Sequence, residues 1–499
     1  MQYHQALSIE KNAVNREDKM IKIKKAIRST TAVLLWPVRM LLASLFSICI
    51  CICVSACGGS SASSTANTSN TNPLTNPVSN VIVPVPQTIV RENPVMLHTE
   101  GTRWVRADGT QKILKGVNLG NWLIQEFWMM GQGSNAIDDQ CKLEAVLDQR
   151  FGYTERERLY RMFRQNWMRG RDWDLIEKFG LNLVRLPFIW SVIEDEKRPG
   201  QLRADAWDYL DDAINQAEQR GLHVILDLHG AVGSQGWEHH SGCAGKNLYW
   251  STPEFQQRTI WLWQQVAARY KDRAAVAGYS LLNEPWGASP EVMAKEVARL
   301  YQAVRALDAN HVIILPGHAS GIDAYGKPAD QGMHNVAFEI HPYPGFFGWG
   351  EPNLQVHKDW LRCGGLGVTG STGVCEWNTR LSKLNTALFI GEFQPWAGLG
   401  AELGGQITRV TYDTYASYGW AATSWSYKLL SNNGGQGNGT WGLVTNQSGQ
   451  KIPALNFQTA SLAEIEALFN SFGSIPYEPQ QAVMAWMTSS VAPDPFAHP

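Results

Sequence analysis

The chain has 499 residues, is 44% hydrophobic and carries a formal net charge of −2, so it has ample apolar material for a globular core. Lys and Arg (43) nearly balance Asp and Glu (45), and no basic stripe appears outside the N-terminus, so we expect no nucleic-acid partner. Trp is the commonest aromatic residue, with 21 against 16 Phe and 15 Tyr; its flat ring and single N–H suit either core packing or contact with a sugar.

The N-terminal segment has the pattern of an export signal. An apolar stretch over about residues 31–56 follows a basic region that contains Lys22, Lys24, Lys25 and Arg28. Its uninterrupted part, residues 40–56, is short for a bilayer span. Met20 is an alternative start to Met1, because it stands directly before this basic region.

The apolar stretch ends in VSACGGS, which resembles the lipobox of bacterial lipoproteins. The resemblance implies a signal peptide over residues 1–56 and lipidation of Cys57, with the mature protein held in the cell envelope. Gly58, rather than an aspartate, follows the cysteine, which implies sorting to the outer membrane in a Gram-negative cell. The alternatives are an ordinary signal peptide, which would leave the protein secreted or periplasmic, and an uncleaved anchor.

Residues 57–93 are rich in Ser, Thr, Asn and Pro and nearly free of charge. This composition has too little apolar surface to pack, so it predicts a flexible linker between the lipid and a folded domain.

The eight cysteines divide between these segments and the domain. Three precede Cys57, and the remaining four are Cys141, Cys243, Cys363 and Cys375. An exported domain can form disulfides, and Cys363 with Cys375 can close a short loop, but four cysteines allow three pairings and the choice stays open. No pair has CxxC spacing, so we predict no metal site.

From about residue 94 the chain alternates short apolar strands with amphipathic helical patterns. Eight strands are predicted, over residues 113–119, 181–188, 223–230, 276–285, 311–317, 336–343, 387–394 and 420–428. Two of the clearest helical patterns lie at 204–221 and 252–272.

Near-continuous apolar strands that alternate with helices indicate a parallel sheet covered on both faces, and eight such units predict a closed (β/α)8 TIM barrel. The alternative is an open doubly wound sheet, which would place a glycine-rich phosphate turn after the first strand. GVNLGNW lacks the G-x-G-x-x-G spacing of such a turn, so nucleotide binding is not expected.

Polar and aromatic residues stand at the C-terminal ends of six of the eight predicted strands, where barrel enzymes carry their active sites. They are Arg185, His229, Asn283 with Glu284, His341 with Tyr343, Glu392 and Trp425. A purely structural core would not choose these residues at six strand ends, so their convergence on one face predicts a catalytic site.

Glu284 and Glu392 form a pair of carboxylates on different strands, as glycoside hydrolysis requires. A separation of about 5 Å would make the reaction retaining. Arg185 can hold Glu392 ionised and Tyr343 can orient it. The other groups can serve the sugar: Asn283 can bond to the 2-hydroxyl, His229 and His341 can bond to hydroxyls or to the carboxylates, and Trp425 can form the floor beneath the ring.

The eight positions and their contexts, NEP and GEF among them, resemble glycoside hydrolase family 5, the cellulase-like retaining β-glycanases, over roughly residues 110–445. The resemblance implies that Glu284 is the general acid/base and that Glu392 is the nucleophile.

Local strings resemble the exo-acting β-1,3-glucanase branch of that family: GVNLGNWLIQEFW, GLNLVRLPF, DLHGAVGSQGWEHHSG and WSYK. The third string extends the end of a strand and carries Trp237 and Glu238, which we expect to wall off a substrate pocket. Trp286, Trp349, Trp396 and Trp441 are further candidates for sugar-binding platforms, with simple loop packing as the alternative. Residues 357–381 depart from the branch as an insertion and leave exo or endo attack open.

The predicted organisation is thus a signal peptide (1–56), a linker (57–93), a catalytic barrel (94–475) and a short Pro-rich tail (476–499). We expect a monomer that hydrolyses β-glucan, with a preference for β-1,3 linkages, and needs no cofactor. The alternatives are an endo-β-1,4-glucanase, a glucan transglycosylase and a non-catalytic glycan-binding lipoprotein. Two intact glutamates favour the enzymes, because a binding module needs neither.

Overall fold

The computed structural model describes residues 82–133, 137–317, 322–345, 353–363, 373–432 and 441–496. The predicted signal peptide, Cys57 and the first part of the linker lie outside these ranges. Within them, no helix combines the length and the hydropathy that a bilayer crossing needs.

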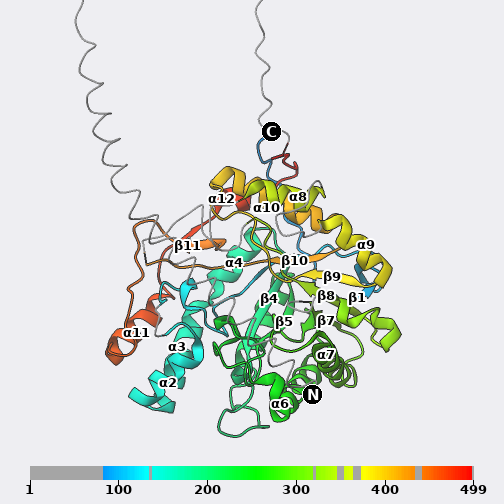
Figure 1. Ribbon diagram of the computed structural model, residues 1–499. Helices are drawn as coiled ribbons and strands as arrows, with labels where there is room; N and C mark the ends of the chain where they lie inside the picture. The colour runs from blue at the N-terminus through cyan, green and yellow to red at the C-terminus, as the bar shows by residue number, and fades with distance from the viewer. Residues whose placement is uncertain are drawn as a thin grey trace, which may run out of the picture. The chain divides into compact units, whose positions relative to one another are not determined.

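A closed barrel of eight parallel strands forms the centre of the described chain (Figure 1). The strands follow one another in chain order around the barrel, and the last pairs with the first. They are β3 (Lys115–Asn118), β4 (Leu183–Ile189), β5 (His223–Gly230), β6 (Val276–Ser280), β7 (Val312–Pro316), β8 (Val336–Ile340), β9 (Ala387–Ile390) and β10 (Ala421–Ser424). All eight coincide with predicted strands, which confirms the TIM barrel. Most end earlier than predicted, because the residues that carry the polar groups already belong to loops.

Helices connect the strands and cover the outside of the barrel (Figure 1). They are α2 (Gln140–Phe151), α3 (Tyr153–Trp167), α4 (Gly170–Lys178), α5 (Asp208–Gln219), α6 (Pro253–Tyr270), α7 (Pro290–Arg305), α8 (Leu354–Arg362), α9 (Val374–Leu384), α10 (Ala401–Ser417), α11 (Leu462–Ser471) and α12 (Gln481–Met487). The two singled out from the sequence are α5 and α6. Pro253 begins α6, where its missing N–H costs no helical hydrogen bond.

The N-terminal end of the barrel is closed by a hairpin of β1 (Leu97–Glu100) and β2 (Arg103–Arg106). Leu97 and Trp104 of the hairpin join a buried apolar cluster with side chains from the barrel strands, Leu183 and Ile225 among them. The indole N–H of Trp104 donates to the carbonyl of Leu388 at 3.0 Å, so its one polar atom is satisfied.

Both predicted flanking segments contact the barrel domain, which corrects the predicted boundaries. Gln87, expected in the linker, donates from its backbone N–H to the carbonyl of Thr488. Glu92 forms ion pairs with Arg106 and Lys112. Hydrogen bonds and ion pairs therefore attach the chain to the domain from Val85 onward.

The predicted tail is also part of the domain. Its strand β12 (Tyr477–Pro479) pairs with β11 (Val444–Asn446), and helix α12 lies against α10. A Cβ on Gly405 of α10 would lie 2.7 Å from the carbonyl oxygen of Ala482, so a glycine there permits the close approach. The segment is short, but it has a preformed surface on which to pack.

Two disulfides link the four cysteines of the domain, Cys141 with Cys243 and Cys363 with Cys375. The second is the loop closure considered from the sequence. The first joins residues 102 positions apart and ties the start of α2 to the loop after β5.

Candidate active site

Arg185 of β4 lies at the centre of the polar groups and is completely buried. Its Nη1 donates to Oδ1 of Asn118 and to Oε1 of Glu392, each at 3.0 Å, and its Nη2 donates to Oδ1 of Asn283 at 2.7 Å. Asp227 and Glu339 also lie 3.1 and 3.0 Å from Nη2. Burial opposes the charge, but the surrounding carboxylates raise the pKa of Arg185, so the guanidinium stays ionised.

Glu392 follows the end of β9 and is held from two sides. Arg185 bonds to Oε1, and the hydroxyl of Tyr343 donates to Oε2 at 2.8 Å. Burial, followed by the charge of Glu392, raises the pKa of Tyr343 well above its usual value, so the phenol keeps its proton and acts as a donor. Two such donors hold the carboxylate of Glu392 in one orientation.

Glu284 follows β6, with its backbone at a φ of 39°, a region that is uncommon for residues other than glycine. His341 Nδ1 lies 2.7 Å from its Oε1, and His240 Nε2 lies 3.2 Å from its Oε2. Its side chain is partly exposed, whereas that of Glu392 is nearly buried. The two glutamates therefore have different surroundings, as two carboxylates with different roles require.

His341 lies between three carboxylates. Its Nε2 is 3.0 Å from Glu339, and its Nδ1 faces Glu284 and, at 3.7 Å, Glu392. Burial opposes protonation, but Glu392, Glu284 and Glu339 together raise the pKa of His341 to about 10. The ring is therefore an imidazolium that donates from both nitrogens.

Glu284, His341 and Glu392 each bring one ligand-type atom within 4.8 Å of the others, a spacing that a metal ion could use. A doubly protonated histidine has no free lone pair for a metal, so the charge state of His341 opposes that use. The same distance describes the two carboxylates, whose nearer oxygens lie within 4.8 Å of each other. Retaining glycosidases hold their carboxyl groups about 5–5.5 Å apart, and inverting enzymes at least about 6.5 Å apart.

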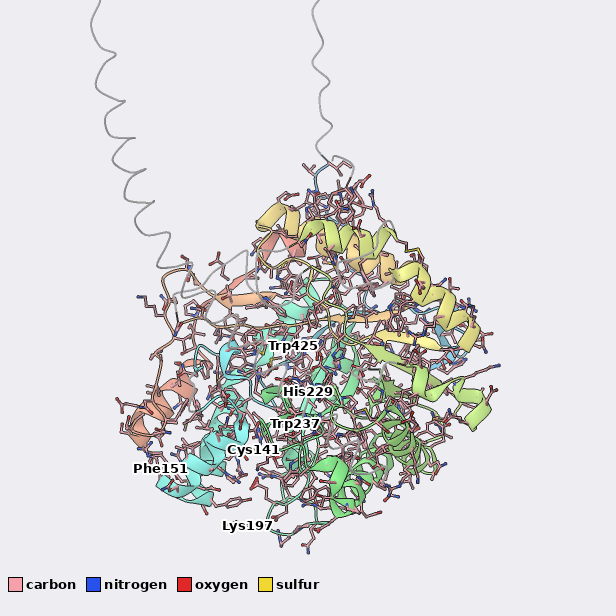
Figure 2. The ribbon with its side chains drawn as sticks, in the orientation of Figure 1. Cys141, Phe151, Lys197, His229, Trp237 and Trp425 are labelled. Atoms are coloured by element: carbon pink, nitrogen blue, oxygen red, sulfur yellow. A yellow bond between two sulfur atoms is a disulfide. The ribbon has the colours of Figure 1, made fainter. Side chains whose placement is uncertain are left out.

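His229, at the end of β5, has both ring nitrogens in contact with neighbours. Nδ1 lies 2.7 Å from Asp227, and Nε2 accepts from the amide of Asn283 at 3.2 Å. The ring stacks on Trp425, with centroids 5.5 Å apart and planes 17° from parallel. Figure 2 labels both residues, near the centre of the view. The structure thus places all eight predicted strand-end residues in one connected group.

The predicted sugar platforms divide into three kinds. Trp237 and Trp286 are 50% and 51% exposed, Glu238 is exposed, and Trp441 packs against Tyr343 with ring centroids 5.6 Å apart. Trp396 is only 2% exposed and belongs to the main hydrophobic core, so its ring has no face for a sugar and this prediction is wrong. Trp349 lies outside the described residues.

Sequence reasoning missed several members of the site: Asn118, Asp227, Glu339, Glu126 and His240. Asp227 and Glu339 each stand two residues before a predicted histidine, and alternate residues of a strand face the same side, so the strand period was an available signal. Glu126 accepts from the indole N–H of Trp128 at 2.8 Å and faces His239 at 3.2 Å. His240 lies in a loop, where no periodic pattern points to it.

Residues 160–429 match the family described as "Cellulase (glycosyl hydrolase family 5)". A "Beta-xylosidase" of Phanerodontia chrysosporium is 30% identical over 368 residues, which is 68% of this chain and 72% of that protein.

Matches to the glucan 1,3-beta-glucosidases are shorter. A "Probable glucan 1,3-beta-glucosidase A" of Aspergillus niger is 33% identical over 36% of this chain and 42% of its own length. A "Glucan 1,3-beta-glucosidase" of Blumeria graminis is 30% identical over 49% of this chain and 58% of its own. The chain thus spans about half the length of these relatives.

Among solved structures, rutinosidase from Aspergillus niger superposes with a TM-score of 0.52 at 17% identity, covering 65% of this chain and 92% of that one. At this identity the likeness supports the fold alone.

Proposed function

Because the chain belongs to the cellulase family, glycosyl hydrolase family 5, and is therefore an O-glycosyl hydrolase, we propose that it is a retaining enzyme acting on β-1,3-linked glucan. The observation that carries the proposal is the carboxylate pair, with nearer oxygens within 4.8 Å of each other and with different environments. In this proposal Glu392 is the nucleophile and Glu284 is the general acid/base.

In the first step, an oxygen of Glu392 attacks the anomeric carbon while the bond to the leaving sugar breaks. Glu284 transfers its proton to the leaving oxygen, and a glycosyl-enzyme ester remains. In the second step, Glu284 takes a proton from water, the water oxygen bonds to the anomeric carbon, and Glu392 leaves as a carboxylate. The two displacements together retain the anomeric configuration.

The neighbouring side chains support this division of roles. Arg185 and Tyr343 donate to the two oxygens of Glu392 and orient it, as a nucleophile requires. Asn283 is held by Arg185 and His229, in place to bond to the 2-hydroxyl of the sugar. Trp425 is the proposed floor beneath that sugar, although it is only 4% exposed and stacks on His229. Trp237 and Trp286 offer half-exposed rings for the remainder of the chain.

The names of the relatives support two substrates. The glucan 1,3-beta-glucosidases favour a β-1,3-glucan, in agreement with the local strings around the site. The relative named beta-xylosidase aligns with more of this chain, so β-xylosides are the second candidate.

A product time course separates these candidates. The purified protein is incubated with linear β-1,3-glucan, mixed-linkage glucan, β-1,4-glucan and β-1,4-xylo-oligosaccharides, with Glu392→Gln protein as the control. Glucose alone from the β-1,3 chain at early times is the expected result, and an oligosaccharide ladder would mean endo attack. Xylose without glucose would favour the second candidate, and no product from any of the four would contradict both.

We also propose that Cys57 carries lipid and holds the enzyme in the cell envelope. Support comes from the VSACGGS string and the basic region before it. Labelling with a radioactive fatty acid in a bacterial host tests the proposal: label on the wild type that is absent from Cys57→Ser is expected, and label on neither would contradict it.

A further inference from the structure

The loop after β5 brings a histidine to the carboxylate assigned as acid/base. His240 lies in the short 3-10 helix η3 (His239–Ser241), and its Nε2 is 3.2 Å from Oε2 of Glu284. Neither of the two displacement steps uses His240. Its position raises the question of what a second imidazole contributes to Glu284.

Covalent and hydrogen bonds fix this loop. The disulfide between Cys141 and Cys243 begins three residues after His240, and the backbone N–H of Cys141 donates to the carbonyl of Gly242 at 2.9 Å. The hydroxyl of Ser241 donates back across His240 to the carbonyl of Glu238 at 2.7 Å. The imidazole is therefore delivered from a rigid loop, as a precise contact requires.

The two oxygens of Glu284 have different partners. Oε1 accepts from Nδ1 of His341, whose pKa is raised to about 10 even though burial opposes its charge. An oxygen that already accepts from a cation is the poorer place for a proton. Oε2 is therefore the oxygen that carries the transferable proton, and it is the one that His240 contacts.

The surroundings of His240 select its tautomer. Among the described residues, its Nδ1 is buried and has no hydrogen-bond partner. A buried lone pair without a partner is tolerated more readily than a buried N–H without one. The neutral ring with its proton on Nε2 meets this condition, and it places that proton on the nitrogen that lies 3.2 Å from Oε2 of Glu284.

Other charged and titratable groups face this pair from several elements. Arg185 of β4 and Tyr343 after β8 interact electrostatically with Glu284, and Glu392 lies across His341. On the side of His240, the rings of His229 and His239 lie edge-on at 5.8 Å, and the charge of Glu126 is within reach. The variants of His240 leave all of these groups in place.

We propose that His240 is a positioning residue that donates from Nε2 to Oε2 of Glu284 and favours the ionised form that accepts a proton from water in the second step. The inference rests on the proposed function, because it assumes that Glu284 is the acid/base. In that step the water O–H bond breaks towards Oε2, and the water oxygen replaces Glu392 at the anomeric carbon.

Loss of the donor raises the pKa of Glu284, because a hydrogen bond to a charged form favours that form. His240→Phe should therefore move the basic limb of the kcat/KM profile, which reports the free acid, about one unit to higher pH. On a dinitrophenyl β-glucoside, whose first step needs little acid assistance, kcat should fall about tenfold and kcat/KM less, because hydrolysis of the glycosyl-enzyme limits turnover. His240→Gln keeps an N–H donor and should restore the limb.

The matched control is His239→Phe, which changes the neighbouring ring of the same loop and should leave the basic limb in place. His240→Met is a second variant without a donor, for use if the phenylalanine disturbs folding, which thermal melting reports. The proposal would be overturned if His240→Phe and His240→Met lost kcat and kcat/KM equally and the basic limb of their kcat/KM profiles did not move. His240 would then have a structural role only.

Glu284→Ala separates failure of this inference from failure of the proposed function. Loss of activity that azide partly restores supports Glu284 as the acid/base, because azide attacks the glycosyl-enzyme without a base. If Glu284→Ala kept full activity, the proposed function would fail. If azide restored Glu284→Ala but the limb did not move in the His240 variants, only the inference on His240 would fail.

Discussion

The two ends of the barrel are built from the same strands and have opposite chemistry. On β4, Leu183 belongs to the apolar cluster at the N-terminal end, and Arg185, two residues later, lies among carboxylates. On β5, Ile225 precedes Asp227 in the same way, and on β8, Ala337 precedes Glu339. Each pair differs by one strand repeat, so one step along the inner face takes the chain from core to site.

This difference separates stability from chemistry within one fold. The N-terminal end buries apolar side chains under Trp104, which lowers the free energy of the folded state. The C-terminal end buries an arginine with three carboxylates, an arrangement that apolar residues of similar volume often match or exceed in stability. Charges at that end are therefore better explained by catalysis than by folding.

The largest effect is expected at the C-terminal end. Glu392→Gln removes the proposed nucleophile and should lower kcat by more than about 10⁴-fold, while Asp227 and Glu339 still pair with Arg185. The unfolding temperature should therefore change little. Assays on an aryl β-glucoside with parallel thermal melts check both statements. A large fall in the unfolding temperature would contradict the view that the C-terminal end serves catalysis and not stability.

The next effect belongs to the N-terminal end. Trp104→Ala leaves a cavity under the hairpin and should lower the free energy of unfolding by about 3–5 kcal/mol. Chemical denaturation measures the loss, and kcat of the protein that remains folded should match the wild type. A selective loss of kcat would show that the hairpin also shapes the distant site.

Two histidines sharpen the comparison through pH. Burial lowers the pKa of His223, at the start of β5, to about 4, so its contribution to stability is complete above about pH 6.5 and is lost as the pH falls towards 4. His341 has its pKa raised to about 10 against the effect of burial, so its contribution is complete below about pH 6.5 and is lost as the pH rises towards 10.

Melting curves from pH 4 to pH 10 test both groups. His223→Gln should reduce the slope of the free energy of unfolding against pH on the acid side, and His341→Gln should reduce it on the alkaline side. Each reduction is at most about 1.4 kcal/mol per pH unit. The two variants are controls for each other, and flattening of the same side by both would refute the assignment.

The smallest effect is expected at the rim. Trp237→Ala removes a half-exposed ring and should lower kcat/KM on the glucan by about 2–10-fold, the equivalent of 0.5–1.5 kcal/mol, with little change in stability. Trp396→Ala is the matched variant, because that ring is buried, and it should lower the free energy of unfolding by about 3–5 kcal/mol. Steady-state kinetics and denaturation curves measure both effects. A loss of stability in Trp237→Ala with a loss of kcat/KM alone in Trp396→Ala would contradict the roles given to the two rings.

Much of the barrel could be predicted because burial on both faces leaves a periodic trace. The eight strands alternate with helices whose apolar residues recur at helical spacing, and both patterns are local. The domain boundaries failed for the opposite reason. Gln87 and Tyr477 lie in polar or Pro-rich stretches, and they are ordered by contacts with surfaces far away in sequence. Composition alone cannot register such contacts.

For the site, the strand pattern was enough to predict which side chains share one face, because parallel strands of one barrel bring their C-terminal ends together. That reasoning identified Glu284 and Glu392 as a pair. Three facts needed the folded chain: the nearer oxygens of the two glutamates lie within 4.8 Å, Trp396 is buried, and Cys141 pairs with Cys243. The position of His240 beside Glu284 could not be predicted either. Long-range packing and a disulfide bring its loop there, and neither leaves a periodic pattern in the sequence.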